Sequence, residues 1–170
     1  MAELINAEIT VETQKGVGSS FIVTMPLNKT NLKNVTKMSQ ELVMIMDWKE
    51  SVILIAEDDE VNYKYIEKLL TRIKGITTSR ARNGKEVVEI ALNQPEVSLV
   101  LMDVKMPVMD GYAATRQIEE NRPELPVIAV TAFAMLHDKI NAQNAGCDDY
   151  ISKPYEADDI LRIIDKFLKK

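Results

Sequence analysis

The stretch SLVLMDVKMPVMDG at residues 98–111 decides the fold expected for this chain. It is apolar from Leu99 to Met102, reaches one carboxylate at Asp103, and then turns through Met106-Pro107 and Asp110-Gly111. A short unbroken apolar run between turn residues predicts a strand buried on both faces, because a strand with one wet face would alternate. Asp103 would then lie at the carboxyl end of the strand, the edge where open α/β sheets bind ligands. The alternative is a solvated loop acid that caps the following helix.

Three further apolar runs also end in polar side chains. VILIA at 52–56 leads into Glu57-Asp58-Asp59, and LPVIAV at 125–130 leads into Thr131. A shorter strand at 149–152 leads into Lys153-Pro154. If the strands are parallel, their carboxylates, hydroxyl and amine gather at one edge of the sheet.

Acids that converge on one edge repel each other unless a cation joins them. An all-oxygen ligand set suits Mg²⁺ rather than zinc, so we expect Glu57, Asp58 and Asp103 to bind Mg²⁺. The alternative, that residues 57–59 only cap a helix, explains their location but not the matching acid on another strand. With the charge of a phosphoryl group offset, the carboxylate of Asp103 can attack it and form an aspartyl phosphate.

The ordered set of motifs resembles a two-component receiver (response-regulator) domain. The resemblance covers roughly residues 51–170 and rests on Glu57-Asp58, Asp103 with MPVMDG, Thr131-Ala132 and YISKP at 150–154. EDDEVN at 57–62 and AGCDDYISKP at 145–154 are most similar to receivers fused to hybrid sensor histidine kinases. The resemblance implies a flavodoxin-like (βα)5 doubly wound parallel sheet with strand order 2-1-3-4-5.

The resemblance also implies roles for individual residues. Asp58 and Asp103 would ligate Mg²⁺ directly, Glu57 through water, and Lys105 through its backbone carbonyl. Lys153 would contact the phosphoryl oxygens, and the Thr131 hydroxyl would hydrogen-bond one of them. Tyr150 would be the switch aromatic, with a half-buried strand tyrosine as the alternative. Asp59 is expected to cap a helix, and the Lys153-Pro154 peptide is expected to be cis.

From Ser51 onward the pattern alternates between strands and helices, which is typical of a parallel sheet covered on both faces. A further strand is predicted at 77–81, and helices are predicted at 61–74, 85–93, 111–121, 134–144 and 156–168. Gly75 is the expected stop of the first helix.

The first 50 residues have a different character. Residues 8–12 and 20–25 are predicted to form a hairpin around Gly16-Val17-Gly18. GVGSSFIVTMPL resembles the closing segment of a histidine-kinase ATPase domain, so residues 1–27 are interpreted as the C-terminal remnant of such a domain, with an unremarkable hairpin as the alternative. One Gly-x-Gly cannot by itself bind ATP. Residues 28–50 are expected to be a linker that ends in a partly packed segment anchored by Trp48.

Charge and composition limit the binding partners and the compartment that we expect for this chain. A net charge of −5 and a pI near 5.0 argue against a nucleic-acid partner. The lone Cys147 supports no disulfide framework, and no apolar run approaches the roughly 18–20 residues of a membrane span, so we expect a cytoplasmic fragment even if the parent kinase is membrane-anchored. His137, the only histidine, is predicted to be a surface residue. The phosphodonor is therefore expected to be a separate histidine kinase or histidine phosphotransfer domain.

The sequence thus predicts a Mg²⁺-dependent phosphoacceptor domain at the C-terminus of a hybrid histidine kinase. The domain would catalyse its own phosphorylation and dephosphorylation, and the kinase active site of the presumed parent is not within this fragment. Two rival functions stay open. A phosphohydrolase that works through an aspartyl phosphate usually carries an acid where Lys105 stands, and a pseudo-receiver binding module is never phosphorylated.

Overall fold

The structure, a computed structural model, describes residues 8–14, 16, 18–24, 48, 50–132 and 136–169. The chain divides into two compact units, residues 1–36 and 37–170. The smaller unit contains the antiparallel strands β1 (Glu8–Gln14) and β2 (Gly18–Thr24). The predicted hairpin is therefore confirmed, but β1 continues to Gln14 and β2 already begins at Gly18. The chain turns within three residues, and Gly16 supplies the positive φ of 83° that such a turn needs.

The larger unit contains a five-stranded parallel sheet. Its strands are β3 (Val52–Ala56), β4 (Thr77–Ala81), β5 (Val97–Asp103), β6 (Val127–Thr131) and β7 (Asp149–Ser152). They lie in the order β4-β3-β5-β6-β7, and each neighbouring pair is parallel. This order confirms the predicted 2-1-3-4-5 topology of a flavodoxin-like sheet. Successive strands are added on one side of β3 and then on the other, so the topological switch point lies between β3 and β5.

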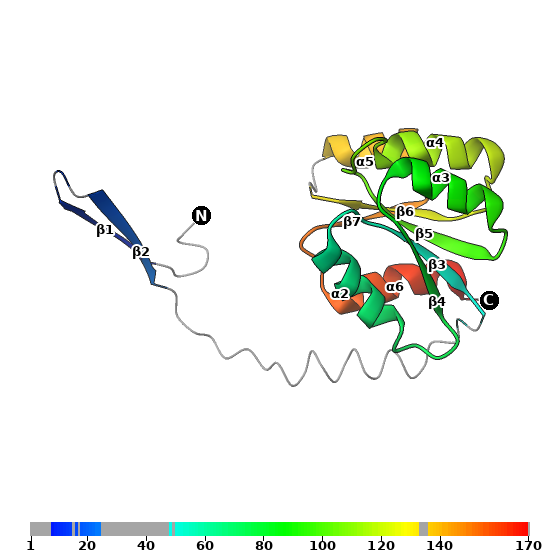
Figure 1. Ribbon diagram of the computed structural model, residues 1–170, viewed down its shortest axis with the longest axis horizontal. Coiled ribbons are helices and arrows are strands. Elements are labelled where there is room, and N and C mark those ends of the chain that lie inside the picture. The colour runs from blue at the N-terminus through cyan, green and yellow to red at the C-terminus, as the bar shows by residue number, and fades with distance from the viewer. Residues whose placement is uncertain are drawn as a thin grey trace. The chain divides into compact units, whose positions relative to one another are not determined.

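Helices cover both faces of this sheet. They are α2 (Glu60–Leu70), α3 (Gly84–Asn93), α4 (Gly111–Asn121), α5 (Leu136–Asn144) and α6 (Ala157–Leu168). Figure 1 shows α2 and α6 on one face and α3, α4 and α5 on the other. None of the helices in the described ranges is long and apolar enough to span a bilayer.

The central strand β5 supplies side chains to two separate cores. Leu99 and Leu101 pack with the residues of α2 and α6, whereas Val100 and Met102 pack with those of α3 and α4. Successive strand residues point to opposite faces, and here both faces are covered by helices. This double burial explains why the run from Leu99 to Met102 is apolar without interruption.

Helix α2 is shorter than predicted. It ends at Leu70, four residues before the expected Lys74, because Thr71 closes it. The backbone N–H and the side-chain hydroxyl of Thr71 both donate to the carbonyl of Glu67, at 2.9 and 2.8 Å. Side-chain hydrogen bonds of this kind compete with the backbone hydrogen bonds that would continue the helix. The next residues leave the helix and bring Ile73 into the core before Gly75 turns the chain with a φ of 86°. The predicted helix was too long because Ile73 has the spacing of a buried helical residue, whereas in the structure Ile73 is buried but lies in a turn.

Trp48 is the anchor expected near the end of the linker. It is 1% exposed and packs into the core between α2, α6 and the sheet. Its indole N–H donates to Oδ1 of Asp165 on α6 at 2.9 Å, so the polar atom of the ring is also paired. The chain before β3 is thereby fastened to α6.

The remaining helix starts agree closely with the prediction. Asp59 caps α2 by accepting from the backbone N–H groups of Val61 and Asn62, both at 2.9 Å, as expected from the sequence. Asp110 caps α4 in the same way at Ala113. The predicted helix at 134–144 is described from Leu136, and its first two residues lie outside the described residues.

Candidate functional site

Three carboxylates meet at the carboxyl edge of the sheet. Glu57 and Asp58 directly follow β3, and Asp103 is the last residue of the neighbouring strand β5. Each contributes a carboxylate oxygen to a group whose members all lie within 4.8 Å of one another. Glu57 and Asp103 are 2% and 7% exposed, whereas Asp58 is open to solvent. The sheet thus brings together the three acids that the sequence predicted to converge.

Lys153 joins this group from the end of β7. Its ammonium group donates to Oε2 of Glu57 at 2.8 Å and to Oδ2 of Asp103 at 2.7 Å. The peptide between Lys153 and Pro154 is cis, as predicted. One amine therefore bridges two buried carboxylates on different strands.

Burial and charge act against each other in this cluster. Burial raises the pKa of Glu57, and the nearby Asp103 adds to this effect, although the hydrogen bond from Lys153 opposes it. Burial alone would lower the pKa of Lys153, but its hydrogen bonds to Asp103 and Glu57 outweigh burial and raise the pKa instead. The amine is therefore held in its charged form, which partly offsets the excess of negative charge.

The other oxygen of Asp103 is also engaged. Oδ1 accepts from the backbone N–H of Lys105 at 3.0 Å, which orients the carboxylate at the strand end. The start of α4 crosses close to this point. A Cβ on Gly111 would lie 2.3 Å from the carbonyl oxygen of Asp103, so a residue without a side chain is needed there.

Thr131 and Tyr150 lie on the strands beyond Asp103. Thr131 is the buried last residue of β6, level with Ser152 of β7, and its carbonyl accepts from the backbone N–H of Lys153 at 2.6 Å. Tyr150 is half-buried and packs against the core on the α3–α5 face, away from the acids. Thr131 is thus at the same sheet edge as Asp103, whereas Tyr150 is not part of the cluster. The side chains of Phe133 and His137 lie outside the described residues.

Three side chains around the acids were not singled out from the sequence. Asn62 donates to Oε1 of Glu57 at 3.4 Å, and Arg80 on β4 donates to the carbonyls of Glu57 and Asp58. Tyr155 follows the cis peptide, and burial raises its pKa to about 12. Asn62, three residues after the cap Asp59, could have been found from helical spacing, because it lies on the first turn. Arg80 is 23 residues from Glu57 and leaves no local signal.

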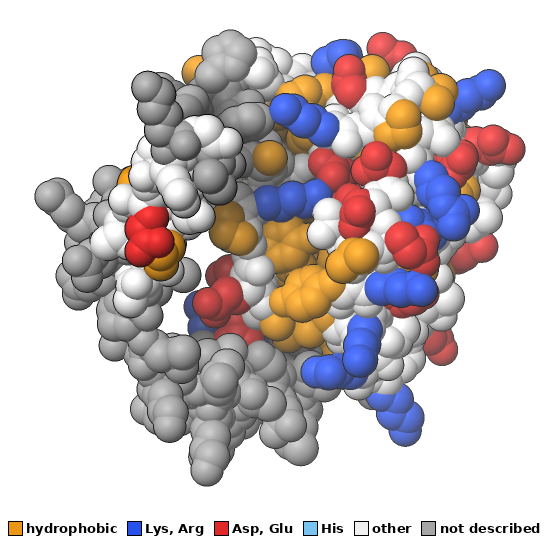
Figure 2. Space-filling view, turned by 60° about the vertical axis from the view of Figure 1, so that its left-hand side comes forward, with side chains coloured by type: hydrophobic (Ala, Val, Ile, Leu, Met, Phe, Trp, Pro, Cys, Tyr) orange, Lys and Arg blue, Asp and Glu red, His pale blue; other side chains and the backbone are white. Residues whose placement is uncertain are grey.

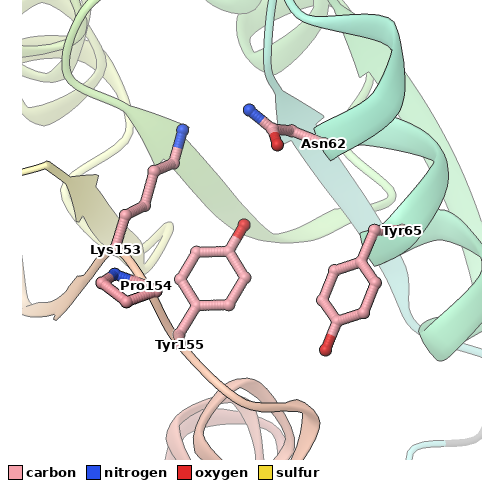
Figure 3. A pocket seen from close by; sticks show the side chains of 5 residues that line it. All are labelled: Asn62, Tyr65, Lys153, Pro154 and Tyr155. Atoms are coloured by element: carbon pink, nitrogen blue, oxygen red, sulfur yellow. The ribbon is translucent and has the colours of Figure 1, made fainter. Parts of the chain in front are cut away.

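A pocket of about 460 Å³ opens beside the acids, lined by Asn62, Tyr65, Lys153, Pro154 and Tyr155. Figure 3 shows Asn62 and Tyr65 on α2 facing Lys153 and Tyr155 across it. The rings of Tyr65 and Tyr155 are 6.3 Å apart between centroids. The pocket is therefore lined by the charged side chain of Lys153, the amide of Asn62 and two aromatic rings. Figure 2 shows hydrophobic side chains next to acidic and basic ones on one face of the molecule.

The cluster is suited to a hard divalent cation. All of its side-chain ligand atoms are carboxylate oxygens, which Mg²⁺ prefers, and the exposed Asp58 leaves a path for an ion and its waters. Buried carboxylates this close together gain from a cation between them. Within the described residues, every buried side-chain nitrogen or oxygen already has a hydrogen-bond partner.

The chain is similar to proteins of two-component signalling. The chain is 36% identical to the polar-differentiation response regulator DivK of Brucella anthropi, over 68% of this chain and 94% of that protein. It is 40% identical to hybrid signal transduction histidine kinase G of Dictyostelium discoideum over 72% of this chain, but the match spans only 4% of that kinase. A match to two-component system protein A of Emericella nidulans, 38% identical, spans 19% of that protein.

Solved structures agree. The receiver domain of a Pseudomonas aeruginosa sensor histidine kinase, crystallised with a magnesium ion coordinated in its active-site cleft, superposes with a TM-score of 0.65. It is 36% identical, and the match covers 71% of this chain and 98% of that one. A family model, the response regulator receiver domain, matches residues 53–165, and this span contains all five strands apart from the first residue of β3. The chain therefore belongs to the response regulator receiver domain family and carries a receiver domain of two-component signalling.

Proposed function

We propose that Asp103 is the phosphoacceptor of this domain and takes a phosphoryl group from a histidine of a kinase or a histidine phosphotransfer domain. The observation that carries the proposal is the bridge from Lys153 to Asp103 and Glu57, since it sets a cation beside a buried carboxylate at the strand end. The carboxylate oxygen of Asp103 would form the new bond to phosphorus as the bond to the histidine nitrogen breaks. The imidazole would leave with that electron pair and take up a proton.

Mg²⁺ is proposed to bind next to Asp103. Asp58 and Asp103 would ligate it directly, Glu57 through water, and Lys105 through its backbone carbonyl. When bound, the ion would supply positive charge that offsets the phosphoryl oxygens. The magnesium ion in the cleft of the similar Pseudomonas receiver supports this assignment.

Two side chains of this chain are proposed to hold the transferred group. The Lys153 ammonium lies 2.7 Å from Oδ2 of Asp103, so phosphoryl oxygens on this carboxylate would fall within its reach. The Thr131 hydroxyl, at the end of the next strand, would hydrogen-bond one of these oxygens. The hydrolase alternative is disfavoured by Lys105, and the pseudo-receiver alternative by the presence of Asp58, Asp103, Thr131 and Lys153 together.

The proposed output is a change on the face of α5, β7 and α6. If Thr131 moves toward a phosphoryl group, space opens behind it, and Tyr150 on the adjacent β7 could rotate into that space. Moving a two-state equilibrium from 1:99 to 99:1 takes about 5.5 kcal/mol, which differential contacts of this kind must supply. Backbone NMR shifts of free and phosphorylated protein test this idea. Changes restricted to the loops at Asp58 and Asp103 would count against it.

The larger protein is proposed to be a hybrid histidine kinase, membrane-anchored or not, whose receiver domain lies in the cytoplasm. The support is the match to a segment of hybrid signal transduction histidine kinase G and to the receiver domain of a Pseudomonas aeruginosa sensor histidine kinase. The interpretation of residues 1–27 as an ATPase-domain remnant, of 28–50 as a linker and of 51–170 as the receiver stays a prediction. The family model begins at residue 53 and does not include the hairpin.

Intact-mass measurement after incubation with Mg²⁺ and acetyl phosphate tests the central proposal. The protein should gain about 80 Da, one phosphoryl group, and Asp103→Asn should keep its fold and gain nothing. A gain of the same mass by Asp103→Asn would show that another residue is the acceptor.

A further inference from the structure

Arg80 makes an unusual set of contacts next to the acidic cluster. It lies on β4, beside β3, which Glu57 and Asp58 directly follow, and its side chain is only 11% exposed. Its Nε and Nη2 donate to the carbonyl of Glu57 at 3.4 and 3.3 Å, and Nη2 also donates to the carbonyl of Asp58 at 3.2 Å. The guanidinium thus binds the backbone of two consecutive acidic residues.

Helix α2 holds the guanidinium in place from the other side. Nη1 forms an ion pair with Glu60, and the group lies over the ring of Tyr63, 4.2 Å from its centroid. Tyr63 is itself fixed by a hydrogen bond from its hydroxyl to Glu67 at 2.5 Å. A planar guanidinium with contacts on its face and its edges has little freedom, and neither a lysine nor a neutral side chain reproduces this geometry.

These contacts act on the segment that turns from β3 into α2. The backbone N–H of Glu57 still pairs with the carbonyl of Ala81 at 3.0 Å, whereas the carbonyls of Glu57 and Asp58 accept hydrogen bonds from Arg80. The rotation of these two peptide units sets the direction in which the side chains of Glu57 and Asp58 leave the backbone. Fixing the carbonyls therefore fixes the carboxylates.

We infer that Arg80 is a positioning residue that holds Glu57 and Asp58 in the arrangement that binds the divalent cation, an inference that rests on the proposed function. The guanidinium of Arg80 contacts the backbone carbonyls of Glu57 and Asp58 and not their carboxylates. It acts through the two backbone carbonyls, as outer contacts do at metal sites generally.

The charge of Arg80 and its positioning role have opposite effects on cation binding. A guanidinium close to the acids repels a divalent cation, so removal of its charge alone would strengthen Mg²⁺ binding. Loss of the contacts to Glu57 and Asp58 would instead loosen the ligands and weaken binding. The sign of the change therefore separates the two roles.

The test is Mg²⁺ titration by calorimetry of the full chain and of Arg80→Met, which keeps the length of the side chain but removes its donors. We expect Arg80→Met to bind Mg²⁺ about tenfold more weakly, the lower end of the effects seen when outer contacts of metal sites are removed. Arg82→Met is the matched control. The side chain of Arg82 is 64% exposed and, among the residues that the structure describes, forms an ion pair with Glu60 alone, at 3.9 Å, so its removal should leave Mg²⁺ affinity unchanged or slightly higher.

Amide hydrogen exchange without Mg²⁺ gives a second readout. In Arg80→Met, the amides of Asp59, Val61 and Asn62 should exchange faster, while those of β5 and β6 should not change. Arg80→Lys, which keeps the charge but has no fork, should show intermediate exchange and intermediate affinity, and it serves as the test if Arg80→Met does not fold.

Specific results would overturn the inference. They are Mg²⁺ binding by Arg80→Met that is as tight as or tighter than that of the parent chain, or amide exchange around Asp59 that does not change. If the parent chain binds no Mg²⁺, the proposed function fails, and the exchange measurement alone still decides whether Arg80 fixes the turn.

Discussion

Lys153 determines the balance of charge in the site. Without it, the buried carboxylates of Glu57 and Asp103 would face each other with no cation between them. Breaking a fully buried pair costs about 3–5 kcal/mol, and the partial exposure of Lys153 reduces the expected loss to about 1–3 kcal/mol. We therefore expect Lys153→Met to lower the free energy of unfolding by this amount in the absence of Mg²⁺, and by less at saturating Mg²⁺, because the ion takes over the role of the amine.

Urea denaturation with and without Mg²⁺ measures both effects. Lys64→Met is a suitable control, since its amine lies 3.4 Å from Glu60 in an exposed pair that contributes at most about 1 kcal/mol. Equal losses for the two variants would show that Lys153 does not offset the buried acids.

Cys147 provides a prediction about pH. Burial raises the pKa of its thiol to about 11, and Thr115 lies 3.7 Å from its sulfur. Because the raised pKa keeps the thiol protonated, its thiolate form is absent at neutral pH and develops only as the pH rises toward 11. At pH 9 about 1% of such a thiol is ionised, against about three-quarters in an unfolded chain. Alkylation by iodoacetamide at this pH, followed by mass, should be at least about 50-fold slower in the native protein than in denaturant. Similar rates in the two states would contradict the burial of this side chain.

At the level of elements, the sequence predicted those helices and strands whose position is visible in a short stretch of residues. The apolar runs identified the strands because both faces of the sheet are covered, and Asp59 marked the start of α2 because a helix cap is a local feature. The early end of α2 was missed, since helical spacing cannot distinguish Ile73 in a turn from Ile73 in a helix.

The site was predictable in part for the same reason. Strand ends are visible in the sequence, so the meeting of Glu57, Asp58, Asp103 and Lys153 follows once the strands are taken as parallel. The topology itself came from resemblance. Contacts such as those of Arg80 depend on which strand lies beside β3 and on side-chain direction, and neither is encoded in a short stretch of sequence.

Arg122 illustrates a second long-range contact and gives a prediction about elements. It follows α4 and donates to four backbone carbonyls near the end of α3 and the start of β5, those of Ala91, Gln94, Pro95 and Val97. Its side chain is largely buried, so removal would leave several carbonyls unpaired. We expect Arg122→Met to lower the free energy of unfolding by about 1–3 kcal/mol.

Urea denaturation of Arg122→Met should be compared with that of Arg116→Met, which removes an exposed arginine from α4 itself. Arg116→Met should change stability by less than about 0.5 kcal/mol. If both variants are equally stable, the carbonyl contacts of Arg122 are replaced by water at no cost.

At the level of the whole molecule, the site is built by one unit of the chain. The three carboxylates of the site, Lys153 and both hydrophobic cores belong to the unit of residues 37–170. Trp48 of the same unit is hydrogen-bonded to α6. The hairpin unit has a different character, because the large apolar side chains of Val11, Phe21 and Val23 are exposed on it. A two-stranded hairpin has no core of its own and is marginally stable in water.

The last prediction follows from this division. Deletion of residues 1–36 should leave the thermal unfolding midpoint of the receiver unit within about 2 °C and its Mg²⁺ affinity unchanged, because a domain with its own core folds independently.

Calorimetry of the full chain with ATP should show no saturable heat, since a single Gly-rich turn lacks the helix and the acid that hold a nucleotide. The truncated chain, titrated alongside, is the control. Micromolar ATP binding that disappears on deletion would instead make the hairpin unit a nucleotide site, and a large fall in the unfolding midpoint would mean that the two units stabilise each other.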